Sequence, residues 1–284
     1  MNVVPRRSGG RYTDARGSRV RVVVQRNKLR EALDAGERVV GARAVTASPV
    51  VVDVYGALGL DFVWLDTEHT GYSPYDSVAL NRLVRAARAA DLEPFVRLGD
   101  ADPAMVRNVL DAGVGTILLP RIETVAQTEA VMKAARYVYD GGPGERGVGA
   151  CLANDWGAAM DGYAERSDEA VLAGILVETA AAVENIEEIV AVPGIDFAFL
   201  GPVDLSVSMG YPMDLDEPAV QRAIERVRAA CSDAGVPIGE MVSDTASIGR
   251  VIEGGARIVR LGDDVRAVRE AVAAQLNVVR DHTG

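Results

Sequence analysis

The chain is poor in several chemically informative residues, and each shortage excludes a class of protein. Cysteine occurs twice, as Cys151 and Cys231, which is too few for a disulfide framework and lacks the spacing of zinc ligands. Lysine also occurs twice. Lys28 precedes the regular part of the chain and Lys133 lies within a predicted outer helix, so neither is placed to form a Schiff base with a substrate.

Long apolar runs are missing as well. No stretch approaches the roughly 18–20 apolar residues that span a bilayer. Residues 1–25 contain no uninterrupted apolar segment of the signal-peptide kind. We therefore expect a cytoplasmic protein that does not associate with membranes.

Charge is distributed unevenly. The formal net charge is −11, yet nine of the 30 basic side chains and only one of the 41 acidic ones fall within residues 1–30. The rest of the chain is therefore more acidic than the net value suggests, and so acidic a body is a poor nucleic-acid binder. An acidic surface that uses arginine in place of lysine favours a salt-loving (halophilic) host, although a GC-rich genome would also favour arginine.

Two regions differ in their patterning. Residues 1–25, rich in Arg, Gly and Ser, show little periodicity and are predicted to be a disordered basic leader. Residues 26–284 form the second predicted region, in which short apolar strands alternate with helical stretches. The predicted strands are Val39–Val45, Phe62–Leu65, Pro94–Leu98, Thr116–Leu119, Leu172–Val177, Phe197–Leu200, Val236–Met241 and Arg257–Leu261. The predicted helices are Asn27–Ala35, Pro49–Leu58, Pro74–Ala90, Pro103–Ala112, Thr124–Tyr137, Ala181–Val190, Pro218–Ala234, Thr245–Glu253 and Asp264–Val279.

Eight such βα repeats predict one α/β domain with the closed TIM (β/α)8 fold rather than an open sheet. No GxGxxG string follows the first strand, which argues against a dinucleotide-binding domain. A long Gly-rich stretch from Tyr139 to about Ser167 interrupts the rhythm and is predicted to be a loop.

Two acidic residues stand where predicted strands end. Glu178 follows the strand that ends at Val177, and Asp204 lies four residues beyond Leu200. Because the carboxyl ends of parallel barrel strands converge on one mouth, these carboxylates can form an oxygen-ligand site for a hard divalent cation. For either residue alone, the alternative is a helix-capping acid in a βα loop.

The string Val63-Trp-Leu-Asp66-Thr-Glu68-His69 ends another strand in the same way. His282 lies next to the C-terminus, so His69 is the imidazole expected near the mouth, where Asp66 or Glu68 can orient it for proton transfer. Arg97 ends the next strand and can hold a carboxylate or polarise a keto oxygen. The alternatives are a capping histidine and a salt bridge in the barrel rim.

A cation between Glu178 and Asp204 would leave positions open for a bidentate 2-oxo acid. The turn Gly201-Pro-Val203-Asp204 precedes a helix start, and its backbone N–H groups would cradle a carboxylate. The pattern therefore predicts metal-assisted carbonyl chemistry, with Arg97, Val203 and Asp204 contacting the substrate.

From about residue 27 to 280 the chain resembles the HpcH/HpaI family of class II, metal-dependent pyruvate aldolases, which includes 4-hydroxy-2-oxoheptanedioate aldolase and 2-dehydro-3-deoxyglucarate aldolase. The matching stretches are Asp61–His69, Phe95–Arg97, Thr116–Pro120, Arg146–Gly149, Val177–Thr179 and Gly201–Ser206. The resemblance implies reversible retro-aldol cleavage of a 4-hydroxy-2-oxo acid to pyruvate and an aldehyde through a metal-stabilised enolate. The implied cofactor is Mg²⁺ or Mn²⁺, with Co²⁺ as a further candidate.

The same resemblance implies a role for each site residue. Glu178 and Asp204 would be the metal ligands, Arg97 would hold the pyruvate enolate, and His69 with Asp66 would be the acid–base pair. The last helix, Asp264–Val279, would swap between subunits of a homohexamer built as a trimer of dimers. The other partners would be the small 2-oxo acid and the aldehyde.

Two positions depart from the family pattern. Leu176 stands where a glutamine is frequent, and Thr67 replaces a frequent glycine, so the preferred substrate is open. Alternative functions are a metal-enolate decarboxylase or cyclising enzyme like macrophomate synthase, a citrate-lyase-β-type CoA-ester lyase, and a non-catalytic barrel. The CoA-ester lyase would need a basic surface for the CoA phosphates, which this acidic chain offers little of.

Overall fold

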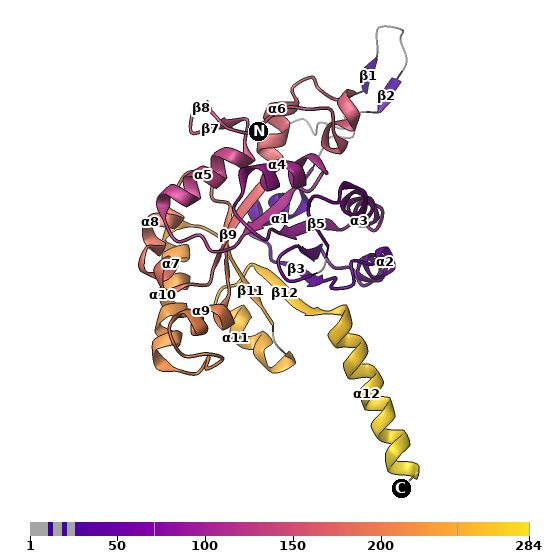
Figure 1. Cartoon of the computed structure of the whole chain (residues 1–284), viewed down its shortest axis with the longest axis vertical. Helices are drawn as coiled ribbons and strands as arrows, with labels where there is room; N and C mark the ends of the chain where they lie inside the picture. Colours follow the sequence, from indigo (N-terminus) through magenta and orange to yellow (C-terminus); the bar gives the residue numbers. More distant parts are fainter. Residues whose placement is uncertain (1–10, 14–18, 22–25, 71, 243, 284) are drawn as a thin grey trace, which may run out of the picture.

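A computed structural model describes residues 11–13, 19–21, 26–70, 72–242 and 244–283. Eight parallel strands close into a barrel in which each strand pairs with the next along the chain and the last pairs with the first (Figure 1). They are β3 (Val39–Arg43), β4 (Phe62–Asp66), β5 (Glu93–Arg97), β6 (Thr116–Leu119), β9 (Leu172–Val177), β10 (Phe197–Leu200), β11 (Ile238–Met241) and β12 (Ile258–Asp263). The predicted TIM-barrel fold is confirmed.

Helices surround the strands, as expected for a barrel of this kind. They are α2 (Pro49–Ala57), α3 (Ser77–Ala89), α4 (Pro103–Asp111), α5 (Val125–Ala135), α7 (Ala180–Glu184), α8 (Ile186–Val190), α9 (Pro202–Ser208), α10 (Pro218–Ala234) and α11 (Ile248–Glu253). The predicted helix Pro74–Ala90 begins only at Ser77, because the side chain of Asp76 caps it by accepting from the Ala79 N–H at 3.0 Å. The predicted helix Ala181–Val190 is instead two short helices that meet at Asn185.

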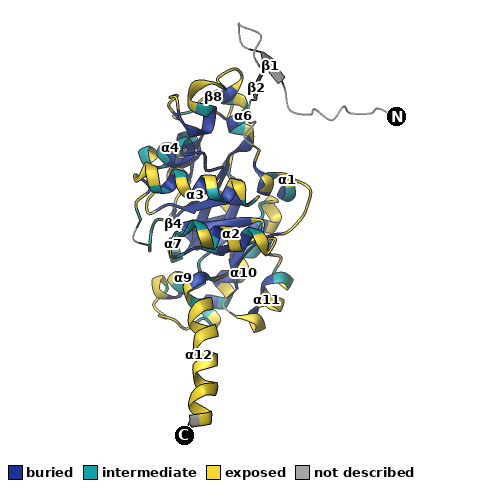
Figure 2. Cartoon of the chain, turned by 90° about the vertical axis from the view of Figure 1, so that its right-hand side faces the viewer, coloured by how far each residue is buried: buried dark blue, intermediate teal, exposed yellow. Residues whose placement is uncertain are grey.

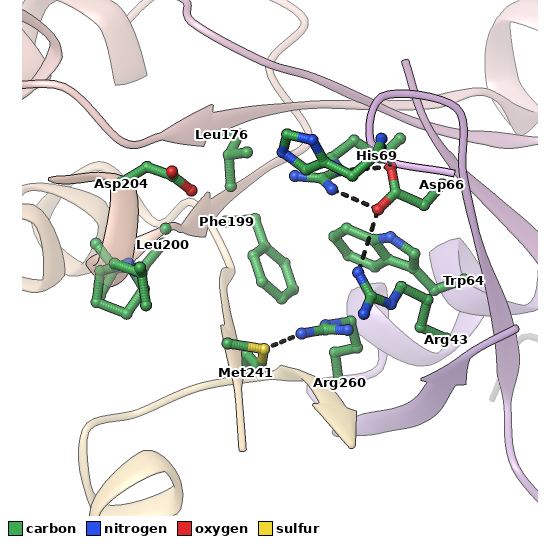
Figure 3. A pocket seen from close by; sticks show the side chains of 14 residues that line it. Arg43, Trp64, Asp66, His69, Leu176, Phe199, Leu200, Asp204, Met241 and Arg260 are labelled. Carbon is green, nitrogen blue, oxygen red and sulfur yellow. Dashed lines mark hydrogen bonds and ion pairs between the residues drawn. The ribbon is translucent and has the colours of Figure 1, made fainter. Parts of the chain in front are cut away.

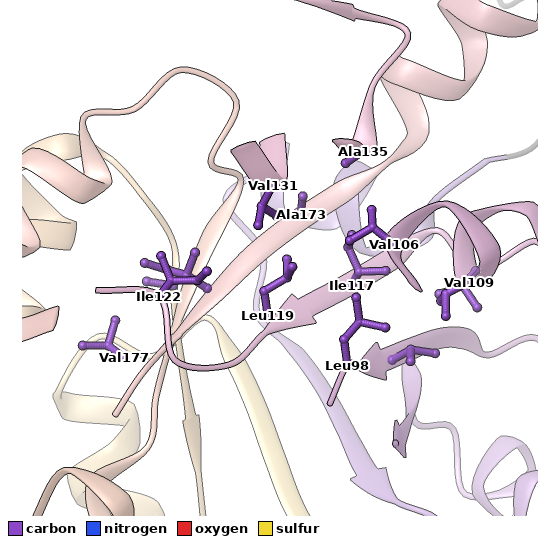
Figure 4. Packing of buried hydrophobic residues seen from close by; sticks show 14 of the residues in the cluster. Leu98, Val106, Val109, Ile117, Leu119, Ile122, Val131, Ala135, Ala173 and Val177 are labelled. Carbon is purple, nitrogen blue, oxygen red and sulfur yellow. The ribbon is translucent and has the colours of Figure 1, made fainter. Parts of the chain in front are cut away.

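Apolar side chains fill two layers. Between strands and helices, Ile117 and Leu119 of β6 lie near Val106 and Val109 of α4, and all four are buried (Figure 4). Inside the barrel the packing is aromatic, and the rings of Trp64 and Phe95 stack with centroids 4.6 Å apart. Glycines make room for these rings. A Cβ at Gly174 would lie 2.3 Å from Phe197, so large and small residues alternate across the interior.

Helix α1 (Lys28–Asp34) closes the N-terminal end of the barrel, which we call the base. Leu29 and Leu33 are buried among the aromatic rings of the interior. The Asn27 side chain accepts from the N–H groups of Leu29 and Arg30, and its amide donates to Thr116 Oγ1 at 2.9 Å. The base is therefore sealed by an apolar plug with a polar anchor.

The segment predicted to be a loop after Tyr139 is structured. It contains β7 (Val138–Tyr139), β8 (Gly142–Pro143), the 3₁₀ helix η1 (Leu152–Gly157) and α6 (Tyr163–Ala170). Arg146 is buried there and donates to Ser167 Oγ at 2.8 Å while lying 3.4 Å from Asp111 of α4. Figure 1 shows α6, β7 and β8 at the opposite end of the molecule from α9 and α11, so this segment belongs to the base and not to the mouth.

Helix α12 (Asp264–Thr283) extends away from the barrel and is exposed along its length (Figure 2). The Asp264 carboxylate fixes its start by accepting from the N–H groups of Val45 at 2.7 Å and Thr46 at 3.2 Å. The part of the chain that the structure describes contains no helix both long and apolar enough to cross a membrane. Within the predicted leader, β1 (Arg11–Thr13) and β2 (Arg19–Arg21) pair antiparallel; residues 1–10, 14–18 and 22–25 lie outside the described residues, so the disordered leader stays a prediction.

Candidate active site

A cavity of about 260 Å³ opens at the carboxyl ends of the barrel strands (Figure 3). It brings together five of the six residues predicted for the site, and the sixth, Glu178, directly follows β9 beside it. The cavity is lined by Arg43, Trp64, Asp66, His69, Arg97, Leu176, Phe199, Leu200, Gly201, Pro202, Val203, Asp204, Met241 and Arg260.

Asp66 and Arg97 form the most buried ion pair of the mouth. They end β4 and β5, and the strand register places them directly side by side. Arg97 Nε donates to Asp66 Oδ1 at 3.0 Å, and Nη2 donates to Oδ2. Burial alone would raise the pKa of Asp66, but the hydrogen bonds and charge of Arg97 outweigh it and lower the pKa. Asp66 is therefore an ionised acceptor that holds the guanidinium in place.

Glu68 and His69 follow β4 on the rim. Glu68 Oε2 lies 2.8 Å from Arg97 Nη1 and 3.7 Å from His69 Nε2. The His69 side chain is 61% exposed and borders the cavity. Asp66 contacts His69 through the backbone, because its Oδ1 accepts from the His69 N–H at 3.3 Å. Of the two acids expected to orient the imidazole, Glu68 is the one that faces the ring.

Glu178 and Asp204 supply the two carboxylates predicted to bind a cation. Glu178 is buried, and its Oε1 accepts from the Arg121 N–H at 3.0 Å. Burial and the nearby charges of Glu68 and Asp204 raise the pKa of Glu178 to about 7. Asp204 lies in the first turn of α9, and Gly201 eases the approach of that turn to Glu178, since a Cβ at position 201 would lie a tight 3.0 Å from Glu178 Cβ.

This donor set fits a hard divalent cation. Carboxylates that repel one another are stabilised by a shared positive charge, and Mg²⁺ commonly uses one or two protein carboxylates while keeping several waters. Among the described residues, no group of three or more His, Cys, Asp and Glu side chains is arranged to enclose an ion. A cation here would therefore leave most of its coordination positions to water and substrate.

Two arginines of the cavity were not anticipated from the sequence. Arg43 ends β3, and its Nη2 lies 2.9 Å from Asp263 Oδ2. Arg260 lies within β12, with its guanidinium 5.4 Å from the centre of the Trp64 ring. The available signal was an arginine at the end of β3 and another within β12.

The remaining predicted positions form the walls. Val203 borders the cavity in the first turn of α9. Leu176 is buried and, with Phe199 and Trp64, makes an apolar surface of the cavity.

Comparison with known proteins gives a consistent result. Residues 44–271 match the family described as HpcH/HpaI aldolase/citrate lyase. The chain belongs to this family. Its curated relatives are named aldolases, so the protein is a lyase of the aldolase type, as the family resemblance of its sequence implied.

Two curated relatives and one solved structure illustrate the similarity. The 2-keto-3-deoxy-L-rhamnonate aldolase of Salmonella gallinarum is 32% identical over 252 residues, covering 88% of this chain and 92% of the relative. The hydroxypyruvate/pyruvate aldolase of Sagittula stellata is 33% identical over 250 residues, covering 88% and 96%. A crystal structure of an HpcH/HpaI aldolase/citrate lyase family protein from Burkholderia cenocepacia has a TM-score of 0.83 at 34% identity, covering 89% of this chain and 99% of that one.

Proposed function

We propose that this HpcH/HpaI aldolase reversibly cleaves a 4-hydroxy-2-oxo acid to pyruvate and an aldehyde. The observation that carries the proposal is the convergence of Arg97, His69 and the Glu178–Asp204 pair on one cavity mouth. Two relatives support it, because the names of both describe aldolases of 2-oxo acids.

Glu178 and Asp204 would hold the divalent cation, which we propose to be Mg²⁺ or Mn²⁺, with Co²⁺ as a further candidate. When bound, the cation supplies Lewis-acid stabilisation of the negative charge that develops on the 2-oxo oxygen. The raised pKa of Glu178 follows from like charges that the cation would balance.

Arg97 would donate a hydrogen bond to the same substrate oxygen. Asp66 and Glu68 hold its guanidinium from two sides, so the group is oriented before substrate arrives. Asp66 thus acts on the reaction through Arg97, with its own charge fixed.

His69 would take the proton of the 4-hydroxyl group as the bond between C3 and C4 breaks. The bonding electrons pass to the C2–C3 unit, an aldehyde leaves, and the pyruvate enolate is then protonated at C3. Glu68, 3.7 Å from Nε2, would stabilise the imidazolium that forms. The exposed position of the ring lets it reach a hydroxyl at the edge of the cavity.

We also propose that α12 packs against a second copy of the chain, within a hexamer built as a trimer of dimers. Five of its six exposed large apolar residues lie along one stripe, namely Val265, Val268, Val272, Leu276 and Val279, and the sixth, Val278, lies to one side of it. Helix α2 carries a matching exposed stripe of Val50, Val54 and Leu58. Each stripe is the kind of surface that a partner helix covers.

The deciding assay is pyruvate release from 4-hydroxy-2-oxo acids of varied chain length, in low and high salt, with Mg²⁺, Mn²⁺ or EDTA. Metal-dependent release that is lost in Glu178→Gln and retained in Glu169→Gln, an exposed acid of α6, would support the proposal. Release of CO2 from oxaloacetate with no aldehyde from any aldol would instead identify a decarboxylase. Light scattering of the chain cut before α12 tests the assembly, which should fall to smaller species.

A further inference from the structure

Arg260 is a buried cation that forms no ion pair with any described carboxylate. Its side chain comes from the middle of β12 and is 8% exposed, yet it borders the cavity. The contact to its Nη2 is the sulfur of Met241, which is a weak acceptor. Within the described part of the chain, no carboxylate lies within ion-pair distance of Arg260.

The other two cavity arginines already pair with carboxylates of the chain. Arg97 is held by Asp66 and Glu68, and Arg43 by Asp263 at 2.9 Å and Asp66 at 3.4 Å. Burial, followed by the charges of Arg43 and Arg97, lowers the pKa of Arg260 to about 10, although the more distant charges of Asp263 and Asp66 act against this. A guanidinium buried beside like charges is unfavourable unless an anion joins it.

The surroundings of Arg260 suit a carboxylate. Its guanidinium lies over the Trp64 ring, 5.4 Å from the centroid, which leaves its N–H groups for a planar, two-pronged acceptor. Phe199 and Met241 complete an apolar enclosure in which such a charge-assisted bond is strong. Figure 3 shows Arg43 and Arg260 on a different side of the cavity from Asp204.

We propose that Arg260, assisted by Arg43, binds a second carboxylate of the substrate, so that this enzyme prefers substrates with an anionic group besides that of the 2-oxo acid end. The inference rests on the proposed function for the reaction and names its substrate class. The second carboxylate can belong to the donor, as in a 2-oxo dicarboxylate, or to the acceptor, as in an aldehyde acid. Both place an organic carboxylate on the same two guanidinium groups.

Binding is testable without catalysis, because the cavity contains one of the two tryptophans. In a Trp156→Phe background, which removes the 60% exposed second indole, the fluorescence of Trp64 reports on its surroundings. Malonate, titrated in the presence of EDTA to keep metals out, should change this signal in a saturable way, and acetate should require a roughly tenfold higher concentration. Arg260→Met should abolish the malonate response, and Arg82→Met, on the exposed face of α3, should retain it.

Catalysis distinguishes the two sources of the carboxylate. Succinic semialdehyde is compared with butanal as acceptor for pyruvate, and oxaloacetate is compared with pyruvate as donor to butanal. In each comparison we take the kcat/KM of the substrate with the second carboxylate divided by that of the substrate without it. For the comparison that uses the site, this ratio should fall by roughly 10- to 100-fold in Arg260→Met. Arg260→Lys keeps the charge and loses the two-pronged geometry, so its kcat/KM ratio should lie between those of the native protein and Arg260→Met. This variant replaces Arg260→Met in both tests if the methionine variant does not fold.

Two results would overturn the inference. One is a malonate response that Arg260→Met leaves intact; the other is an unchanged kcat/KM ratio in both comparisons. Malonate binding lost in the variant, in a protein that releases no pyruvate from any aldol, would keep the anion site and reject the proposed aldolase function. The two proposals therefore fail separately.

Discussion

Each end of the barrel buries a carboxyl group at a strand terminus, and the two groups, Asp66 at the mouth and Glu93 at the base, differ in charge. At the mouth, Asp66 is ionised because Arg97 is bonded to it, and its pKa lies below the ordinary range. At the base, Glu93 begins β5 and is buried without a bonded guanidinium, and burial raises its pKa to about 8 despite the charge of Arg88. Asp66 keeps its charge because it is paired, whereas Glu93 loses its charge by protonation.

The two ends of the barrel also differ in how they are closed. The base is plugged by Leu29 and Leu33 of α1, and the buried amide of Asn27 donates a hydrogen bond to Thr116 Oγ1. The mouth keeps a cavity in which Glu178 is raised in pKa by neighbouring acids and Arg260 has no carboxylate partner among the described residues. Unbalanced charges at the mouth are what a cation and an anionic substrate would balance, whereas the base is complete without a ligand.

The largest effect that separates the two ends is expected for Glu178→Gln. Loss of a cation ligand should lower kcat/KM by roughly 10³-fold, because Lewis-acid stabilisation contributes several kcal/mol to the transition state. Unfolding without metal should be unaffected or shifted to higher temperature at pH 8, since burial already opposes the charge of this carboxylate. Steady-state kinetics and thermal unfolding of the same samples check both parts.

The proposed difference between mouth and base would be rejected if Glu178→Gln kept its activity, or if its unfolding temperature were well below that of the native protein. Added Mn²⁺ should raise the unfolding temperature of the native protein and of Glu169→Gln, but not that of Glu178→Gln.

Leu29→Ala should have the reverse effect of Glu178→Gln, lowering stability while leaving activity nearly unchanged. Leu29 is fully buried in the plug, so its truncation should lower the free energy of unfolding by roughly 2–5 kcal/mol. At a temperature where the variant is folded, kcat/KM should stay within about twofold of the native value, because the plug lies at the opposite end of the barrel from the cavity. Urea unfolding and pyruvate release measure the two, and a large loss of activity in folded protein would show that the ends are coupled.

The sequence predicts the elements that depend on neighbouring residues, and it misses those that depend on contacts between residues far apart in the chain. Short apolar strands bounded by turns identify themselves, and the predicted Thr116–Leu119, Leu172–Val177 and Phe197–Leu200 agree with the strands of the structure. The segment after Tyr139 was predicted to be a loop because it is rich in glycine, whereas its order depends on Arg146, which contacts the distant Asp111 and Ser167. No local period records such a contact.

The site was predictable to the extent that barrel geometry converts strand ends into neighbours. That rule brought Asp66 and Arg97 together, as the register shows. Which acid faces His69 depends on the path of the rim loop, so Glu68 could not be chosen over Asp66 beforehand. Arg260 escaped notice because a residue inside a strand faces either the cavity or the helices, and its partners come from β4 and β11.

A smaller effect, with a pH dependence, is expected for Glu93→Gln. The folded protein holds the Glu93 proton to about pH 8, whereas the unfolded chain releases it near its ordinary value of 4.5. The contribution of Glu93 to the free energy of unfolding is therefore fully present below about pH 4.5 and is lost as pH rises towards 8. The glutamine variant lacks this loss, so it should gain on the order of 2 kcal/mol relative to the native protein between pH 6 and pH 9.

Urea unfolding of both proteins across that range measures the difference. A difference that is constant with pH would mean that Glu93 is ionised in the folded state and that the two ends treat buried carboxyls alike. Glu169→Gln, exposed on α6, controls for the general change in net charge.

The smallest effect is expected for Asn27, which anchors the plug with two kinds of hydrogen bond. Asn27→Ala removes the cap on the Leu29 and Arg30 N–H groups and the bond to Thr116 Oγ1, and should lower the free energy of unfolding by about 1–2 kcal/mol. Asn27→Asp keeps the cap and loses only the donated bond, so it should recover part of that loss below pH 7. If Asn27→Asp is as destabilised as Asn27→Ala, the bond to Thr116 outweighs the cap. The polar anchor of the plug would then be chiefly the buried bond between Asn27 and Thr116, which joins distant segments as the Asp66–Arg97 pair does at the mouth.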